Sequence, residues 1–490
     1  MKLAPQKFSP LKMVKIKPWL AAAIAAFSFN ASLRPAAAQT TSYCRFDSDA
    51  IAEKESLRVA AVDGDSEARQ RYNAILQKQA ESLRRCREQT WPQTQAIWLR
   101  VYPCDARPGA MDALFDHIVN KGYNQVHVEV FFDAQVLLPA NDNPTPWVSV
   151  VRSPGAENVD LLAMAIAKGR ERGIKVYAWA FTMNFGYGYG LRPDREQVLA
   201  RNGKGQTSIS YVRDNTQTFI DPYNPQAQQD YQKLVQAIAR RKPDGMLFDY
   251  IRYPRGAGSQ SVAGNVKDLW IYGEASQQAL QRRAFNGQAS ELIGRFLQQG
   301  FINANDLQAV RQLYPTETTP EWQGRNPMAG DTLPALQTQL WLLTVAHAAQ
   351  GVVDFLNLAI RPLQSSNIPA GAVFFPDANK SVGQQGYDSR LQPWDRFPAG
   401  IEFHPMAYSI CGSPSCNVEE IMRTISLAPP QAKVIPALAG YWGRRDGNRP
   451  SLEEQMNAIR QQIPSITALS HFAYSWQEPE IDQRRRSCQL

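Results

Sequence analysis

Residues 244–254, DGMLFDYIRYP, contain the stretch that decides the fold. The apolar and aromatic run from Met246 to Ile251 predicts a short strand that is covered on both faces, as in a parallel sheet. Asp244-Gly245 forms the turn into this strand, and Pro254 ends it because proline cannot donate the next ladder hydrogen bond. Asp249 is an acid within this run, and a buried carboxylate is costly unless it is paired or put to use.

Asp249 is the leading candidate for a catalytic residue. It lies near the C-terminal end of its strand, which is where the residues of a parallel barrel meet substrate. The alternative is an aspartate that only caps a neighbouring loop.

Seven further segments are predicted to be strands, and helical patterns alternate with them. The strands are 95–102, 123–132, 175–184, 368–375, 400–409, 433–442 and 468–476, with outer helices at 111–121, 159–172, 225–241 and 333–363. This order predicts an α/β protein of the (β/α)8 TIM-barrel class. An open doubly wound sheet is the alternative, but no GxGxxG turn follows the first strand.

The chain divides into three predicted parts. Residues 1–38 are a signal peptide, 39–94 an N-terminal helical extension, and 95–490 the barrel. Too few residues follow the last strand for a full eighth helix, so the helix at 65–88 is expected to fill that place. A helical insertion at 255–332 follows the fourth strand and is expected to lie over the active-site face.

The leader consists of a basic flank, an apolar core at Leu20–Phe27 and a small-residue cleavage site at Ala36–Ala38. A membrane anchor is the alternative, but the apolar run is shorter than the ~20 residues of a span. The leader carries six basic residues and no acid, so its removal lowers the formal charge from +8 to +2. We therefore expect an exported, periplasmic or extracellular protein that binds no nucleic acid. No other apolar stretch is long enough for a membrane span, and the oligomeric state stays open.

All six cysteines follow the leader, which favours disulfides in an oxidising compartment. Cys411 and Cys416 are expected to close a small loop. For the other four we favour Cys44 with Cys86 and Cys104 with Cys488, although three pairings are open. Five histidines spread over the chain, with no HxH or HExxH pair, do not favour a metal site, and no cofactor is expected.

Glycoside hydrolysis needs two carboxylates that flank the scissile bond. Asp249 is expected to act as nucleophile or base, with Glu129, Asp377 or Glu478 as the acid partner. Glu129 lies in mid-strand and could instead be a buried hydrogen-bonding partner. Polar and aromatic side chains near strand ends are the candidate substrate contacts: Asn184, Arg252, Tyr253, His404, Tyr408 and Trp476. Strand histidines such as His404 could equally be core residues.

Several stretches together resemble the bacterial glycosyl-hydrolase-like family 10, whose members are glycosidase-like TIM barrels. They are YNQVHVEV (123–130), PWVSVV (146–151), RGIKVYAWAF (172–181) and DGMLFDYIRYP, followed by HPMAYS (404–409) and HFAYSW (471–476). The resemblance covers most of residues 95–478. It implies a carbohydrate-active hydrolase with Asp249 as the leading carboxylate and with Trp179, Tyr253 and Tyr408 at the cleft. The chain departs from the family at EVFFDAQ (129–135), where an arginine and a glycine are missing, so Glu129 and Asp133 cannot both be carried over.

The sequence thus predicts an exported glycoside hydrolase that acts on an envelope or extracellular polysaccharide. A non-catalytic carbohydrate-binding barrel is the main alternative, and a metal-dependent hydrolase that uses the strand histidines is a weaker one.

Overall fold

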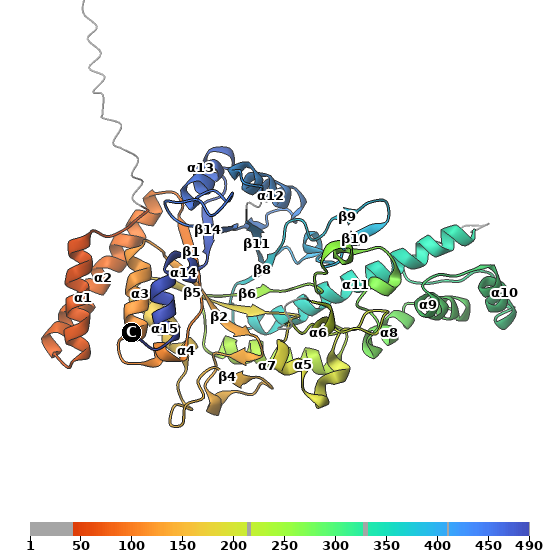
Figure 1. Ribbon diagram of the computed structural model, residues 1–490, viewed down its shortest axis with the longest axis horizontal. Helices are drawn as coiled ribbons and strands as arrows, with labels where there is room; N and C mark the ends of the chain where they lie inside the picture. The colour runs from red at the N-terminus through yellow and green to blue at the C-terminus, as the bar shows by residue number, and fades with distance from the viewer. Residues whose placement is uncertain (1–42, 213–216, 327–331, 409–410, 490) are drawn as a thin grey trace, which may run out of the picture. The chain divides into compact units, whose positions relative to one another are not determined.

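The computed structural model describes residues 43–212, 217–326, 332–408 and 411–489, so the expected leader lies outside the described chain. Eight parallel strands form a closed barrel (Figure 1). They are β1 (Thr94–Leu99), β2 (Gln125–Phe132), β5 (Lys175–Phe181), β6 (Gly245–Asp249), β8 (Ala370–Phe374), β11 (Glu402–Ala407), β13 (Ala437–Ala439) and β14 (Ala468–Phe472). Because β1 pairs with both β14 and β2, the open-sheet alternative is excluded and the TIM barrel is confirmed.

The strand register identifies the barrel type. Pairing partners followed from Trp98 once around the ring lead back to a position eight residues earlier in the chain. This stagger is the shear of 8 that an eight-stranded TIM barrel requires. The seventh strand is interrupted, because β12 (Lys433–Val434) and β13 are separate segments around Pro436, which has no N–H to donate.

Six long helices lie outside the strands. They are α3 (Ala110–Asn120), α4 (Leu161–Glu171), α7 (Pro225–Arg240), α11 (Leu333–Gln364), α12 (Pro414–Leu427) and α13 (Leu452–Gln462). α7 begins as its sequence predicts, with the Asn224 side chain accepting hydrogen bonds from the first turn and Pro225 at the first helical position. The connection from β8 to β11 contains short elements only, and there the indole of Trp394 stacks on Phe374 at 4.8 Å and covers the strand.

The remaining elements are short or lie outside the barrel ring. The short strands are β3 (Gln135–Val136), β4 (Val148–Ser149), β7 (Val262–Ala263), β9 (Ser381–Val382) and β10 (Gly386–Asp388). The short helices are α5 (Tyr187–Gly190), α6 (Ser208–Tyr211), α14 (Tyr474–Gln477) and α15 (Pro479–Arg486), with 3-10 turns at 103–106, 140–142, 193–198, 258–261, 266–268 and 394–396.

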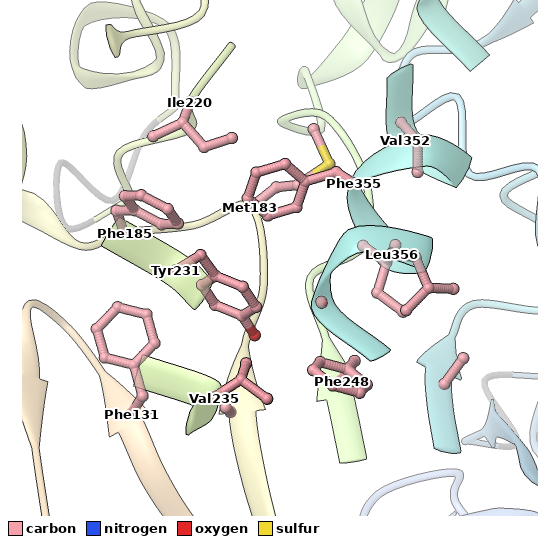
Figure 2. Close-up of a cluster of buried hydrophobic side chains, with 14 of the residues drawn as sticks. Phe131, Met183, Phe185, Ile220, Tyr231, Val235, Phe248, Val352, Phe355 and Leu356 are labelled. Atoms are coloured by element: carbon pink, nitrogen blue, oxygen red, sulfur yellow. The ribbon is translucent and has the colours of Figure 1, made fainter. Parts of the chain in front are cut away.

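A dense apolar layer joins the barrel to α7 and α11. Phe248 of β6, Tyr231 of α7 and Phe355 of α11 are fully buried, and Figure 2 shows their side chains converging between the strands and the two helices. By length and composition α11 could cross a membrane, although the sequence predicted no membrane span after the leader. However, 67% of its most apolar window is buried inside the protein, so α11 is a core helix of the barrel.

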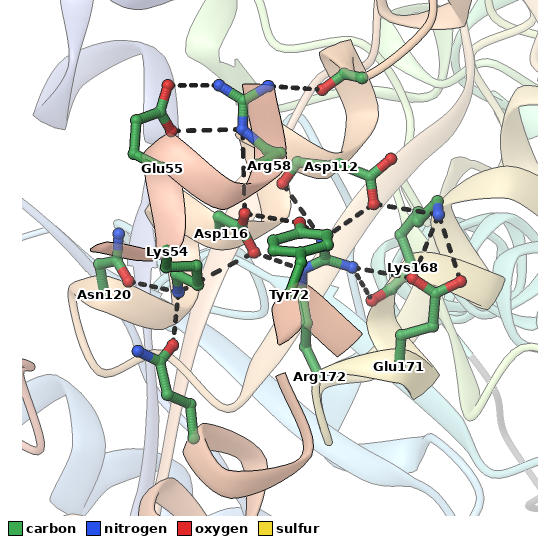
Figure 3. A network of polar contacts seen from close by, with 12 residues as sticks. Lys54, Glu55, Arg58, Tyr72, Asp112, Asp116, Asn120, Lys168, Glu171 and Arg172 are labelled. Carbon is green, nitrogen blue, oxygen red and sulfur yellow. Dashed lines mark hydrogen bonds and ion pairs between the residues drawn. The ribbon is translucent and has the colours of Figure 1, made fainter. Parts of the chain in front are cut away.

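The N-terminal extension consists of α1 (Ser48–Val62) and α2 (Ser66–Gln89). A buried polar network attaches it to α3 and α4 (Figure 3). Lys54 of α1 donates to Asn120, Tyr72 of α2 donates to Asp116 at 2.7 Å, and Arg172 donates to the same carboxylate at 2.8 Å. The expectation that α2 fills the eighth helix place is wrong, because α14 and α15 follow β14 and contact β1 and the turn at 103–106.

The helical part of the insertion consists of α8 (Glu274–Gln281), α9 (Gly287–Gln299) and α10 (Ala304–Leu313). Figure 1 places α9 and α10 near the end of α11 that is remote from the barrel strands. Ser276 of α8 donates its N–H to Asp221, and the N–H of Ile302 bonds Gln337 of α11. These contacts attach the insertion to α11 and to the segment that leads into α7.

Three disulfides join Cys44 to Cys86, Cys104 to Cys488 and Cys411 to Cys416. These are the three favoured pairings. The first closes the extension onto its own entry segment. The second ties the C-terminal segment to the turn after β1.

Candidate active site

The register sorts the inward side chains of the barrel into layers. With a shear of 8, a layer takes four side chains from alternate strands, each shifted by one residue per strand. The layer nearest the C-terminal end consists of Glu129, Asp249, Met406 and Phe472, and the layer below it of Trp98, Trp179, Val373 and Ala437. Two carboxylates of the chain therefore share the uppermost of these layers.

Asp249 is the last residue of β6 and is 7% exposed. Its Oδ2 accepts a hydrogen bond from Trp179 Nε1 at 3.1 Å, and its Oδ1 accepts one from the Tyr250 N–H at 2.6 Å. Tyr250 has φ 53°, and this left-handed bend directs its N–H back to the carboxylate. Burial raises the pKa of Asp249 to about 6, against these hydrogen bonds and the Arg252 charge.

Glu129 is the second carboxylate and is 1% exposed. Its Oε2 accepts a hydrogen bond of 2.5 Å from Nε of Arg100, which follows β1, while its buried Oε1 has no protein partner among the described residues. Burial raises the pKa of Glu129, the Arg100 charge opposes the rise, and the nearby Asp249 charge adds to it. The charge of Asp249 therefore acts on the Glu129 carboxyl group, as expected of two carboxylates in one site.

The spacing of the strands fits such a pair. β2 and β6 are separated by β5 alone, so their axes lie about 10 Å apart. Inward side chains converge from this distance. Carboxyl separations between about 5 and 9.5 Å serve glycoside hydrolysis by one or the other stereochemical course.

Aromatic side chains continue the site along one side. The ring of Phe472 lies 6.2 Å from Trp179, 5.8 Å from Tyr408 and 5.8 Å from Trp476. The charge of Asp249 contributes to the raised pKa of Tyr408, so this phenol is near the carboxylate. Of the predicted substrate contacts, Trp179, Tyr408 and Trp476 are thus brought together with Asp249.

Arg252 joins the site from the other side. Its guanidinium lies 4.6 Å from the ring centroid of Tyr250 and 5.4 Å from that of Phe219. The side chain is 7% exposed and donates to the Tyr253 carbonyl. Arg252 therefore supports the segment that follows Asp249 and contributes positive charge near it.

Two predicted acid partners lie elsewhere. Glu478 turns outward after α14 and contacts α3, where its carboxylate lies 3.1 Å from Lys121 Nζ and 3.6 Å from His117 Nε2. Asp377 is half-exposed and pairs with Arg390 at 2.9 Å. Both carboxylates are held by cations outside the layer of Asp249, so the structure does not support either as its partner.

Three predicted substrate contacts are buried and bond other parts of the chain. Asn184 is buried and accepts hydrogen bonds from the backbone of Gly186 and Thr218. Tyr253 is fully buried and donates to the Ala348 carbonyl under α11. His404 is fully buried two layers below Asp249, against His127 and Glu402. Sequence patterns did not separate these positions from the site because each lies on or just beyond a strand.

The structure adds Arg100 and Phe472 to the site. Arg100 directly follows a strand, so its position was the available signal, but its partner Glu129 is 29 residues away in the chain. Phe472 closes the layer opposite the carboxylates, and only the strand register reveals this.

The strand histidines do not converge on a metal. His127 and His404 lie inside the barrel, whereas His471 lies on the outer face of β14 against Tyr123 and Trp442. Across residues 43–489, leaving aside the short gaps in the description, no group of three or more His, Cys, Asp or Glu side chains is arranged to hold a metal ion.

The chain is similar to several solved structures at low identity. It shares 13% identity with the glycoside hydrolase domain of PgaB (BpsB) from Bordetella bronchiseptica, covering 79% of this chain and 97% of that domain, with a TM-score of 0.47. It shares 10% identity with the catalytic domain of β-amylase from Paenibacillus polymyxa, covering 78% and 92%, with a TM-score of 0.46. For the β-N-acetylhexosaminidase of Bacteroides fragilis the identity is 10%, the coverage 81% and 64%, and the TM-score 0.38.

No curated protein matches the sequence. The family model described as glycosyl hydrolase-like 10 matches residues 95–281, a range that contains β1 to β6 and therefore Arg100, Glu129, Trp179 and Asp249. This match confirms the resemblance that the central strand suggested.

Proposed function

We propose that the protein is an exported glycoside hydrolase that cleaves O-glycosidic bonds of a bacterial envelope or extracellular polysaccharide. The observation that carries the proposal is the pair of buried carboxylates, Asp249 and Glu129, in one layer at the C-terminal end of the barrel. The glycosyl hydrolase-like family match supports it. Three disulfides support export, because such bonds persist in oxidising compartments.

The contacts of the two carboxylates favour different roles. Glu129 is bonded to the Arg100 guanidinium, which favours its ionised form, whereas Asp249 accepts hydrogen bonds from neutral donors and has a pKa raised to about 6. We therefore assign Asp249 as the general acid, the reverse of the role that its sequence suggested. Its proton goes to the glycosidic oxygen as the C–O bond breaks. The Glu129 carboxylate then either bonds the anomeric carbon, from which water later displaces it, or takes a proton from the water that attacks this carbon.

The first test measures the release of reducing ends from a panel of envelope and extracellular polysaccharides. The mature protein is expected to release them, and Asp249→Asn is expected to reduce the rate by about 10²-fold or more because it cannot donate the proton. Release by Asp249→Asn at the wild-type rate would remove Asp249 from the mechanism.

Aryl glycosides with a nitrophenolate leaving group test the assignment of roles. This leaving group needs no proton, so Asp249→Asn should retain much of the first step, whereas Glu129→Gln should lose it. The opposite result would restore Asp249 as nucleophile or base.

A carbohydrate-binding barrel without catalysis is the second candidate. It is favoured by the Arg100 contact, which already neutralises one member of the pair. Binding of a glycan with no release of reducing ends from any substrate would select it.

A further inference from the structure

Three arginines follow neighbouring strands at the C-terminal end of the barrel. The two carboxylates come from β2 and β6. Arg100 follows β1, and Arg444 and Arg449 lie in the segment after β13, where backbone bridges join Tyr441 to Arg444 and Asp446 to Arg449. These arginines follow strands on one arc of the rim, because β1, β14 and β13 are neighbours in the barrel. The Arg100 guanidinium, however, turns toward β2 and lies 4.2 Å from the ring centroid of Phe132.

An aromatic stack lies on the same arc. The rings of Trp476 and Tyr441 are nearly parallel, with centroids 6.0 Å apart, and Trp476 contacts Phe472 of the carboxylate layer. The Arg444 guanidinium lies 4.2 Å from the Tyr441 ring centroid, and that of Arg449 lies 5.5 Å from Trp476. Flat aromatic rings suit contact with a sugar ring, and two guanidinium groups lie against these rings.

These arginines retain unused hydrogen-bond donors. Arg444 is exposed and forms no ion pair with any described residue. The side chain of Arg100 is 44% exposed and uses Nε on Glu129, while its two terminal amino groups have no acceptor in the described chain. Arg449 bonds the Tyr408 carbonyl through Nε and Asp446 through one amino group. A guanidinium with a free edge is matched in shape and charge by a planar carboxylate.

We propose that Tyr441, Arg444, Arg449 and Trp476 form an arginine–aromatic surface that binds a sugar bearing a carboxylate. The substrate class is then an acidic, uronate-containing polysaccharide. This inference rests on the proposed function, since it names the substrate of the same site. A neutral glycan would leave the charge of Arg444 unused.

Binding to the full mature chain carrying Asp249→Asn tests the inference without turnover. The probes are an oligogalacturonate, a neutral cello-oligosaccharide and a sulfated oligosaccharide of equal length. The oligogalacturonate should bind most tightly, and added salt should weaken it. Arg444→Gln should weaken it about five- to tenfold by removing a charge-assisted hydrogen bond, while leaving the neutral probe unchanged.

The adjacent Arg445 provides a matched control. It is exposed like Arg444, but it pairs with Glu454. Arg445→Gln should therefore leave oligogalacturonate binding unchanged. Equal weakening by both variants, or equal binding of the neutral probe, would overturn the inference. Tighter Arg444-dependent binding of the sulfated probe would overturn the choice of a carboxylate.

The two proposals fail separately. Arg444-dependent binding of oligogalacturonate without hydrolysis of any polysaccharide would refute the hydrolase and keep the surface. Hydrolysis of a neutral glycan by a protein that does not bind oligogalacturonate would refute the surface and keep the hydrolase.

Discussion

At the scale of single residues, the carboxyl group of Asp249 is subject to opposing effects. Two hydrogen bonds favour its ionised form, and burial disfavours it more strongly, so its pKa rises to about 6. A general acid must be protonated at the working pH. We therefore expect kcat/KM to fall as the pH rises through about 6, measured on the substrate that the reducing-end assay identifies. A rate that still increases above about pH 7 would contradict the assignment.

The same pKa predicts how stability depends on pH. The folded state holds the Asp249 proton more tightly than the unfolded chain, whose pKa is near 3.8, so this group's contribution is complete below about pH 4 and is lost as the pH rises through 6. The Asp249→Asn variant lacks this titrating group, so its stability does not fall for this reason as the pH rises. Its free energy of unfolding, relative to wild type, should rise by about 3 kcal/mol between about pH 4 and pH 8, measured by urea denaturation. A difference that stays constant with pH would contradict the raised pKa.

The Glu129–Arg100 pair predicts an asymmetry between two single substitutions. Glu129→Gln leaves a half-exposed arginine that water can solvate, whereas Arg100→Gln leaves a buried carboxylate without its cation. At about pH 8, Arg100→Gln should be the more destabilising by about 2 kcal/mol, a value lowered because Arg100 is partly solvated. The gap should close in acid, where Glu129 is protonated. Equal urea midpoints at both pH values would show that the pair is not coupled to folding.

The sequence indicated Asp249 and left Glu129 open for a physical reason. An acid at the end of an apolar strand is visible in one stretch of sequence, whereas the layer that Glu129 occupies depends on the register of β2, β5 and β6. Glu478 shows the converse. It follows a strand by a few residues, but α14 turns the chain outward before it, and this turn was read as a continuation of the strand.

At the scale of elements, alternating patterns predicted most of the barrel because the strands are largely apolar and are buried over nearly their whole length. The place of α1 and α2 was not predictable in this way, because a buried polar network fixes much of their contact with α3 and α4. Lys54 is 1% exposed and donates to Gln79 and Asn120, and burial lowers its pKa to about 8.

Asp116 is the residue whose loss should release the extension. It accepts from Tyr72 and Arg172 and lies 3.9 Å from Lys54 Nζ, so Asp116→Ala leaves two buried cations without their shared anion. We expect a loss of about 3 kcal/mol and faster hydrogen exchange confined to α1 and α2. Arg84→Ala is the control, because Arg84 pairs with Glu81 and Glu88 on the exposed face of α2 and should leave exchange unchanged. Exchange that rises equally throughout the barrel would contradict a local attachment.

At the scale of the whole molecule, the barrel closes between its first and last strands. The β1–β14 pairing forms this seam. Beside it lies the buried Arg485–Asp105 ion pair, whose charged atoms are 2.7 Å apart, and the Cys104–Cys488 disulfide links the segments that follow the two strands. The sequence suggested the disulfide but not the seam that it protects, because the two cysteines are 384 residues apart.

The chain-entropy effect of a disulfide grows with the length of the loop that it closes. Replacing Cys104 and Cys488, which are 384 residues apart, by serine should therefore cost about 6 kcal/mol, whereas replacing Cys411 and Cys416, which are 5 residues apart, should cost about 2 kcal/mol. Urea denaturation of the two double variants measures the difference, and hydrogen exchange should locate the larger loss at β1 and β14. Equal losses would mean that opening the long loop gives the unfolded chain no more freedom than opening the short one. The seam would then be held by the β1–β14 pairing and the Arg485–Asp105 contact without help from the disulfide.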